Sequence, residues 1–220
     1  MRAALMHTDE FLRGTGSFRP GAEAVRPAWW LPVMILVLAP IYGAWMGSFH
    51  FDSPERLLQV AYSAVKLPLL LFSTSLLCLP GFFVLNTILG LRDDFREAMQ
   101  AVLAGQAALS VALASLSLLT RFWYYSCTSY RSALLFNAAM FTVATIAGQY
   151  VMLRYYRALI RRRRYHRITL YAWMALYAFV GIQMGWILRP FVGDPRMAVT
   201  FFRAEAFSNA YVVVARLIFG

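Results

Sequence analysis

The sequence predicts an all-α membrane protein, a polytopic helix bundle with five transmembrane helices and short interfacial helices beside them. Hydrophobic residues make up 60% of its 220 residues and charged residues only 14%, whereas soluble domains are about 45–50% apolar and about 25% charged. The apolar residues are gathered in long stretches that charged turns separate. Since a spanning helix needs roughly 20 apolar residues, one membrane domain accounts for most of the chain.

The chain divides into a cytoplasmic N-terminal arm at 1–28, a five-helix transmembrane domain at 29–190 and an external tail at 191–220. The arm is polar, and its glycines and prolines disfavour a long helix. Towards the end of the tail, apolar residues recur at spacings of four, three and four. About a dozen residues in such a pattern predict an interfacial helix, because they are too few to span a bilayer.

Five spans are expected, at 29–49, 67–90, 98–120, 132–153 and 168–188. The third span is rich in small residues, which predicts a place in the crowded middle of the bundle. Aromatic residues fill the segment 121–131 that follows it. Because aromatic side chains are enriched at the membrane–water interface, we expect a short external loop there.

The second span is expected to contain a break. Apolar character is nearly continuous over 57–91, and these 35 residues would form a helix of about 52 Å, beyond the ~30 Å hydrocarbon core. We therefore expect an interfacial helix at 54–66 and a kinked span at 67–90. Lys66 marks the junction and is expected to extend its ammonium group to the lipid headgroups. Three residues are candidate helix breaks: Pro68, Pro80 and Gly81.

Two pairs of glycines are spaced one helical turn apart, Gly43 with Gly47 and Gly181 with Gly185. Small residues at this spacing let two membrane helices approach closely. We expect both pairs to lie at helix packing sites. Glycine is also frequent in spanning helices in general, so a simple composition effect is the alternative.

An arginine cluster separates the fourth and fifth spans. Because basic residues are enriched in cytoplasmic loops, the cluster predicts orientation: with the N-terminus inside, thirteen basic residues are cytoplasmic and eight external. The C-terminus is then periplasmic. Each basic residue near an anionic membrane surface adds about 1 kcal/mol of binding free energy, so the cluster is also expected to bind anionic headgroups or an acidic protein segment. Its members are Arg154, Arg157, Arg161, Arg162, Arg163, Arg164 and Arg167.

The sequence carries no sign of enzymatic chemistry. All ten acidic residues and all three histidines lie outside the predicted spans, whereas intramembrane proton transfer or metal binding needs such groups inside them. No phosphate-binding, nucleophile or zinc-protease motif occurs, so we expect no catalytic, cofactor or metal site. Cys78 and Cys127 are expected to be unpaired. The chain has a net charge of +11, and its basic residues flank the apolar spans. This placement favours anionic lipid over nucleic acid as the binding partner.

Four segments carry a family resemblance: 66–70 (KLPLL), 86–90 (NTILG), 188–195 (LRPFVGDP) and 201–203 (FFR). Together with the five spans and the cytoplasmic arm, they resemble the Yip1-domain class of small five-helix membrane proteins, in a bacterial group that shares these signatures over about 60–215. The resemblance implies a five-helix fold and a place in the bacterial inner membrane. It implies no established activity.

Two functions are consistent with this architecture. The leading hypothesis is a non-enzymatic inner-membrane protein that organises lipids or partner proteins, a homo-oligomer included, through its arginine cluster and external tail. The alternative is a small permease or channel whose pathway follows the second helix, where Pro80 and Gly81 would expose backbone carbonyls to a polar cavity. Solute flux through the purified protein in liposomes would separate the two hypotheses.

Overall fold

The computed structural model describes residues 29–51, 54, 56–194 and 197–203. Within them the chain is all-helical, and five helices are long and apolar enough to cross a membrane. The predicted fold class and number of spans are therefore confirmed. The predicted arm at 1–28 and the interfacial helix of the tail lie outside the described residues. The elements are α2 (Trp30–Gly47), α3 (Arg56–Ile88), the short 3-10 helix η2 (Arg92–Asp94), α4 (Phe95–Ser126), α5 (Tyr130–Arg162) and α6 (His166–Ile187).

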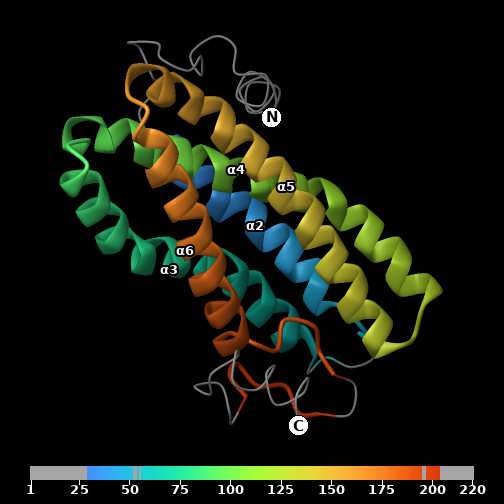
Figure 1. The fold of residues 1–220 in the computed structure, drawn as a ribbon. Helices are drawn as coiled ribbons and strands as arrows, with labels where there is room; N and C mark the ends of the chain where they lie inside the picture. Colours follow the sequence, from blue (N-terminus) through green and yellow to red (C-terminus); the bar gives the residue numbers. More distant parts are fainter. Residues whose placement is uncertain (1–28, 52–53, 55, 195–196, 204–220) are drawn as a thin grey trace, which may run out of the picture.

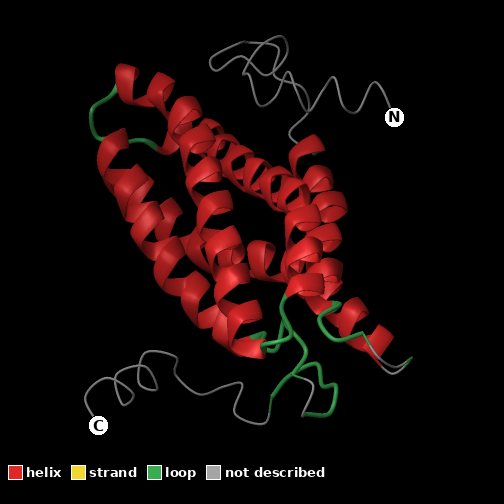
Figure 2. Cartoon of the chain, turned by 90° about the vertical axis from the view of Figure 1, so that its right-hand side faces the viewer, coloured by secondary structure: helices red, strands yellow, loops and turns green. Residues whose placement is uncertain are grey.

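The helices pack side by side in the order α6, α3, α2, α4, α5, so that α2 lies in the middle (Figure 1). Their connectors lie at the two ends of the bundle (Figure 2). One end holds the α3–α4 segment with η2 and the α5–α6 connector. The other end holds the described part of the α2–α3 connector, the α4–α5 connector and segments 188–194 and 197–203. This alternation is the one expected of a chain that crosses a membrane five times.

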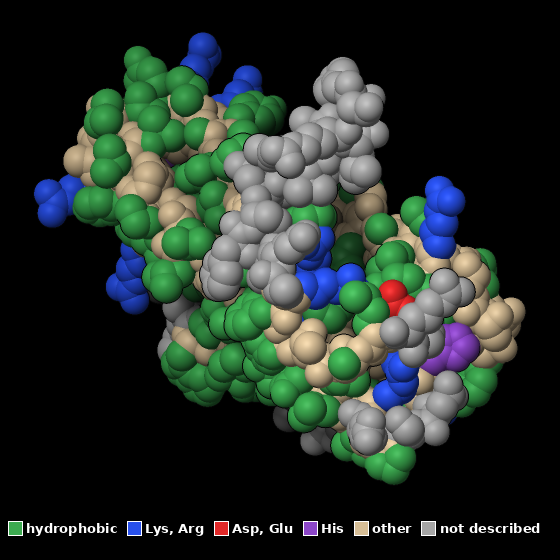
Figure 3. All heavy atoms as spheres, turned by 90° about the horizontal axis from the view of Figure 1, so that it is seen from below, with side chains coloured by type: hydrophobic (Ala, Val, Ile, Leu, Met, Phe, Trp, Pro, Cys, Tyr) green, Lys and Arg blue, Asp and Glu red, His purple; other side chains and the backbone are tan. Residues whose placement is uncertain are grey.

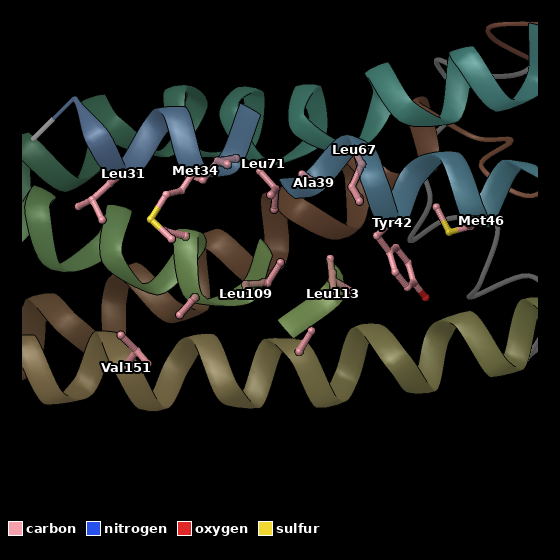
Figure 4. Packing of buried hydrophobic residues seen from close by; sticks show 14 of the residues in the cluster. Leu31, Met34, Ala39, Tyr42, Met46, Leu67, Leu71, Leu109, Leu113 and Val151 are labelled. Atoms are coloured by element: carbon pink, nitrogen blue, oxygen red, sulfur yellow. The ribbon is translucent and has the colours of Figure 1, made fainter. Parts of the chain in front are cut away.

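The core lies where α2 packs between α3 and α4. Figure 4 shows buried hydrophobic side chains pointing into the space between the helices. A membrane helix gains little hydrophobic energy from burial against another helix, so close packing has to supply the contacts. The largest fully buried side chain of α2 is Tyr42. The other side chains that Figure 4 labels around it are Leu31, Met34, Ala39, Met46, Leu67, Leu71, Leu109, Leu113 and Val151.

Glycines bring α2 and α3 into backbone contact. A Cβ atom at Gly43 would collide with the carbonyl oxygen of Ser63, and one at Gly47 would lie 2.8 Å from the carbonyl oxygen of Gln59. Since real Cβ atoms do not approach that closely, a side chain at either position would push the two helices apart. Gly43 and Gly47 thus lie at a helix packing site, as expected from their spacing of one helical turn.

The second glycine pair differs from the expectation. A Cβ atom at Gly181 would lie 3.6 Å from a methyl group of Thr74, an ordinary contact, and one at Gly185 would meet nothing within 4 Å. The close approach occurs instead between α4 and α5, where a Cβ atom at Gly148 would lie 2.7 Å from the carbonyl oxygen of Gly105. Glycine spacing defines a small face on one helix, but it does not say which helix lies opposite.

Helix α3 is a single helix, so the predicted separation of an interfacial helix from the second span is wrong. It runs from Arg56 to Ile88 with Pro68 and Pro80 inside it, so the separate interfacial helix expected at 54–66 is absent from the described residues. Each proline removes one backbone hydrogen bond, to the carbonyl four residues earlier, and helices in a bundle tolerate that loss because their neighbours compensate for it. Gly81 is likewise helical and packs 3.5 Å from Leu176 of α6, measured from an ideal Cβ.

Two helices are longer than predicted. The loop expected within the aromatic segment 121–131 is only the connector 127–129, because α4 continues to Ser126 and α5 begins at Tyr130. Tyr124 extends the helical packing here, since its hydroxyl donates a hydrogen bond to the carbonyl oxygen of Met46 at 3.2 Å. At its other end α5 continues to Arg162, so most of the arginine cluster lies on the last turns of a helix.

Candidate functional site: the arginine-rich end of the bundle

Two connectors are tied together at one end of the bundle by arginine side chains. Arg162, the last residue of α5, donates hydrogen bonds to both carboxylate oxygens of Glu97 in α4, at 2.9 Å each. Arg163 donates to the carbonyl oxygen of Gly90 at 2.6 Å. Hydrogen bonds between charged groups are stronger than neutral ones, so these contacts join the end of α5 to the segment between α3 and α4.

A buried histidine completes this joint. The side chain of His166 at the start of α6 has no exposed area, and its Nε2 lies 3.0 Å from Oδ2 of Asp94. Arg162 also lies 3.7 Å from the second carboxylate oxygen of Asp94. The hydroxyl groups of Tyr156 in α5 and Thr169 in α6 are hydrogen-bonded at 3.1 Å and also join these two helices. The carboxylate of Asp94 therefore connects α5 and α6 to η2.

The backbone that receives Arg163 is shaped by a glycine. Gly90 has a φ angle of +69°, in the left-handed region that favours glycine. Its N–H donates to the carbonyl of Thr87 at 3.1 Å, and the next N–H, of Leu91, donates to the carbonyl of Asn86 at 2.7 Å. This pair of hydrogen bonds is the Schellman arrangement that ends a helix. It terminates α3 and leaves the Gly90 carbonyl to accept from Arg163.

The seven predicted arginines divide by their environment. Arg162 and Arg163 hold the two connectors together, and Arg154 is half-buried and has an interaction partner. The side chains of the remaining four are exposed and make no hydrogen bond or ion pair with a described residue. We call these four the arginine surface: Arg157, Arg161, Arg164 and Arg167.

The arginine surface is a site of concentrated positive charge. Arg157 and Arg161 are four residues apart on α5, a spacing at which like charges on a helix repel each other. Two of the three acidic residues of segment 92–97, Asp94 and Glu97, are already paired with Arg162. An anion that approaches this end from outside therefore meets guanidinium groups whose charge is not neutralised by the described part of the protein.

Segment 92–97 lies between the second and third predicted spans. Its place in the sequence therefore puts it on the same side of the membrane as the arginine cluster, but does not show which residues pair. The contacts to Glu97 and Asp94 join residues 65 and 72 positions apart. The signal was present, since the only acidic residues between the second and fifth predicted spans lie in that turn. An acid and a base on the same side of a helical hairpin are natural candidates for such a pair.

The interior polar groups form structural networks away from this end. Asn137 of α5 accepts a hydrogen bond from the Tyr42 hydroxyl at 2.9 Å and donates to the Tyr124 hydroxyl at 2.7 Å, joining α2, α4 and α5. Gln106 of α4 donates to the Ser75 hydroxyl of α3 at 2.5 Å. The part of the chain that the structure describes contains no cluster of three or more His, Cys, Asp or Glu side chains able to hold a metal ion.

The two cysteines differ in their surroundings. Cys78 is fully buried in α3, and Cys127 lies in the α4–α5 connector with part of its surface exposed. Hydrogen bonds from the Ser132 hydroxyl and the Ser129 backbone lower the pKa of the Cys127 thiol. Both thiols are free, as the sequence predicted.

Comparison with known proteins adds no functional assignment. No protein-family model matches the chain, and no curated protein or solved structure is significantly similar to it. The function has to be argued from the fold and from the geometry of the arginine-rich end.

Proposed function

We propose that this chain is a non-enzymatic protein of the bacterial inner membrane that gathers anionic lipid headgroups at its arginine surface. The observation that supports the proposal is that the arginines of the cluster fall into two groups. Arg162 and Arg163 form structural hydrogen bonds with Glu97 and with the Gly90 carbonyl. The side chains of the arginine surface are exposed, and no described acidic side chain pairs with them.

The charges of this surface suit an anionic membrane. A basic residue close to acidic lipid contributes about 1 kcal/mol of binding free energy, so four of them together give roughly 4 kcal/mol before losses of side-chain entropy. Arginine also forms paired hydrogen bonds with phosphate oxygens. An acidic segment of a partner protein, or of a second copy of the chain, is the other ligand with matching chemistry.

The proposed orientation follows from the same charges. The end with the arginine surface faces the cytoplasm under the positive-inside rule, which places the N-terminus inside and segment 188–203 on the periplasmic side. Membership of the Yip1-like group of five-helix proteins is part of this proposal. It rests on the sequence resemblance carried by segments 66–70, 86–90, 188–195 and 201–203.

The permease hypothesis is the alternative function. It needs backbone carbonyls near Pro80 and Gly81 to face a polar cavity, and α3 is helical through both residues. A direct test is the flux of ions and small solutes through purified protein in liposomes. Selective flux that is abolished by Asn137→Leu or Gln106→Leu would favour a pore over lipid binding.

The proposal is tested by counting lipids bound to the purified full-length protein with native mass spectrometry. Phosphatidylglycerol should remain bound in preference to phosphatidylcholine, and a variant with Arg157, Arg161, Arg164 and Arg167 all replaced by glutamine should lose most of that preference. Raising the salt concentration should weaken binding in the same direction, because counterions screen surface charges.

A matched control replaces arginines at the other end of the bundle. Arg121→Gln with Arg131→Gln also removes positive charge, but these residues lie at the α4–α5 hairpin, so the preference measured at the arginine surface should persist. Equal binding of phosphatidylglycerol by the fourfold variant and the parent protein would refute the proposal. Recovery of a stable acidic protein partner that the fourfold variant loses would assign the surface to protein binding.

A further inference from the structure

The end of the bundle opposite the arginine surface contains a cavity of about 490 Å³ between α2, α3, α5 and segment 188–203. Binding sites for small molecules are typically about 300–1,000 Å³ and mostly apolar with a few polar groups. This cavity has that character, because Leu70, Leu134 and Phe141 are among its walls while Arg189 and Arg203 line it as well. Figure 3 views the molecule from this end and shows basic side chains set among hydrophobic ones.

A buried lysine lies behind the cavity wall. Lys66 has no exposed area, so it does not extend to the headgroups as the sequence predicted. Its ammonium group donates a hydrogen bond to the carbonyl oxygen of Pro190 at 2.8 Å and lies 4.8 Å from the centre of the Phe201 ring. Pro190 itself lines the cavity, so the positive charge of Lys66 is held one residue away from the cavity.

Arg203 adds a second positive charge at this point. It lines the cavity together with Tyr130 and lies close enough to Lys66 for the two cations to repel each other. Within the described ranges, neither Lys66 nor Arg203 forms an ion pair with a carboxylate. Burying cations without an anion is costly, so a negative charge placed here would be strongly favoured.

One described carboxylate lies near this pair of cations. Asp194, the one acidic residue of segment 189–203, lines an adjoining cavity of about 230 Å³ together with Arg56 and Arg203. Among the described residues that line the two cavities, basic side chains outnumber acidic ones.

The depth of the cavity matches that of lipid headgroups. Helix α6 has 22 residues, which at 1.5 Å per residue give about 33 Å, close to the ~30 Å hydrocarbon core. Arg189 lies two residues beyond the end of this helix, and its guanidinium is 3.4 Å from the centre of the Trp186 ring. Tryptophan is typical of the membrane interface. Leu134 and Ala138 of α5 are exposed at the cavity edge, so the apolar part opens sideways, where acyl chains would lie.

We propose that this cavity binds one anionic phospholipid, with its phosphate at Arg203 and its acyl chain along Leu134, Ala138 and Phe141. The chemistry recognised is a phosphate group, which a lipid or free phosphate can supply. The apolar walls and the sideways opening favour the lipid. This site is separate from the arginine surface, lies at the other end of the bundle and shares no residue with it.

The experiment uses the full chain in proteoliposomes that contain photoactivatable phosphatidylglycerol, with a diazirine in one acyl chain, or the matching phosphatidylcholine. After irradiation, phosphatidylglycerol should label peptides that contain residues 134–141, and phosphatidylcholine should label them several times less. Arg203→Gln should lower this labelling about fivefold, the effect of losing roughly one basic contact. Arg131→Gln, on the exposed face of the same hairpin, is the matched control and should leave labelling unchanged.

A second variant separates loss of lipid binding from misfolding of Arg203→Gln. Ala138→Phe changes an exposed residue, keeps every charge and fills the edge of the cavity, so it should also reduce labelling while the unfolding temperature stays that of the parent. Equal labelling by both lipids, or full labelling of both variants, overturns the proposal. Loss of labelling in the presence of excess inorganic phosphate would assign the site to a free anion. Labelling that appears only after residues 204–220 are removed would assign it to the chain's own C-terminal segment.

Discussion

The imidazole Nε2 of His166 lies 3.0 Å from Oδ2 of Asp94, and this contact joins the first residue of α6 to the turn before α4. Asp94→Asn should weaken it, because the amide carries no charge to attract Arg162 or the imidazole. A hydrogen bond to a charged group contributes about 1.5–3 kcal/mol, and the carboxylate is 18% exposed, so we expect a loss of about 1–2 kcal/mol. The unfolding temperature of the protein in detergent measures the effect.

The neighbouring acid provides the control for that substitution. Asp93 is exposed and adjacent in sequence, so Asp93→Asn changes the net charge of the turn by the same amount without touching His166. Its unfolding temperature should stay within error of the parent. A fall of equal size in both variants would mean that the charge of the turn matters and the His166 contact does not.

The backbone conformation of Gly90 allows a second test. At φ +69°, with no atom within 4 Å of an added Cβ, a side chain would be strained but would not collide. Gly90→Val should therefore destabilise the protein by about 1–2 kcal/mol, the cost of the left-handed conformation for an ordinary residue. Gly90→Asn should cost clearly less, because asparagine tolerates that conformation. Equal unfolding temperatures for the two variants would contradict this account.

Much of the architecture was predictable from the sequence because membrane spans obey simple constraints. Apolar length sets the number of helices, and charged turns mark their ends. The structure has the five spans that these rules predict. The placement of turn 92–97 beside the arginine cluster follows from counting crossings, and the contact between Arg162 and Glu97 agrees with it.

The contacts between distant segments were not predictable in the same way. Lys66 was expected at the headgroups, yet its partner is the carbonyl of Pro190, 124 residues away. The arginine cluster looked like a loop, but arginine is a good helix former, and α5 continues to Arg162. Which residue lies across from a given side chain depends on how helices are arranged in space, and a single sequence contains no direct record of that.

The contact between Gly43 and Ser63 predicts a strong response to one methyl group. Gly43→Ala would place a Cβ against the Ser63 carbonyl oxygen and the Ala64 Cα at 2.9 Å, so α2 and α3 would have to separate. Overpacking of this kind costs about 1–3 kcal/mol. Gly185→Ala is the matched control, because its Cβ meets nothing within 4 Å. Unfolding temperatures in detergent should fall for the first variant only, and unchanged stability of both would show that the helices accommodate the methyl group.

The two native cysteines test the orientation of the chain. Cys127 lies in the connector between α4 and α5, at the end opposite the arginine surface, whereas Cys78 is fully buried. Under the proposed orientation, a membrane-impermeant maleimide should label Cys127 in intact cells stripped of their outer membrane, and not in sealed inside-out vesicles. Because hydrogen bonds lower the pKa of the Cys127 thiol, its reactive thiolate should persist to lower pH than in an unstructured peptide, and labelling should slow only as the pH falls further. Cys127→Ser should abolish the signal. Labelling from the vesicle side alone would place the arginine surface outside the cell and reverse the topology.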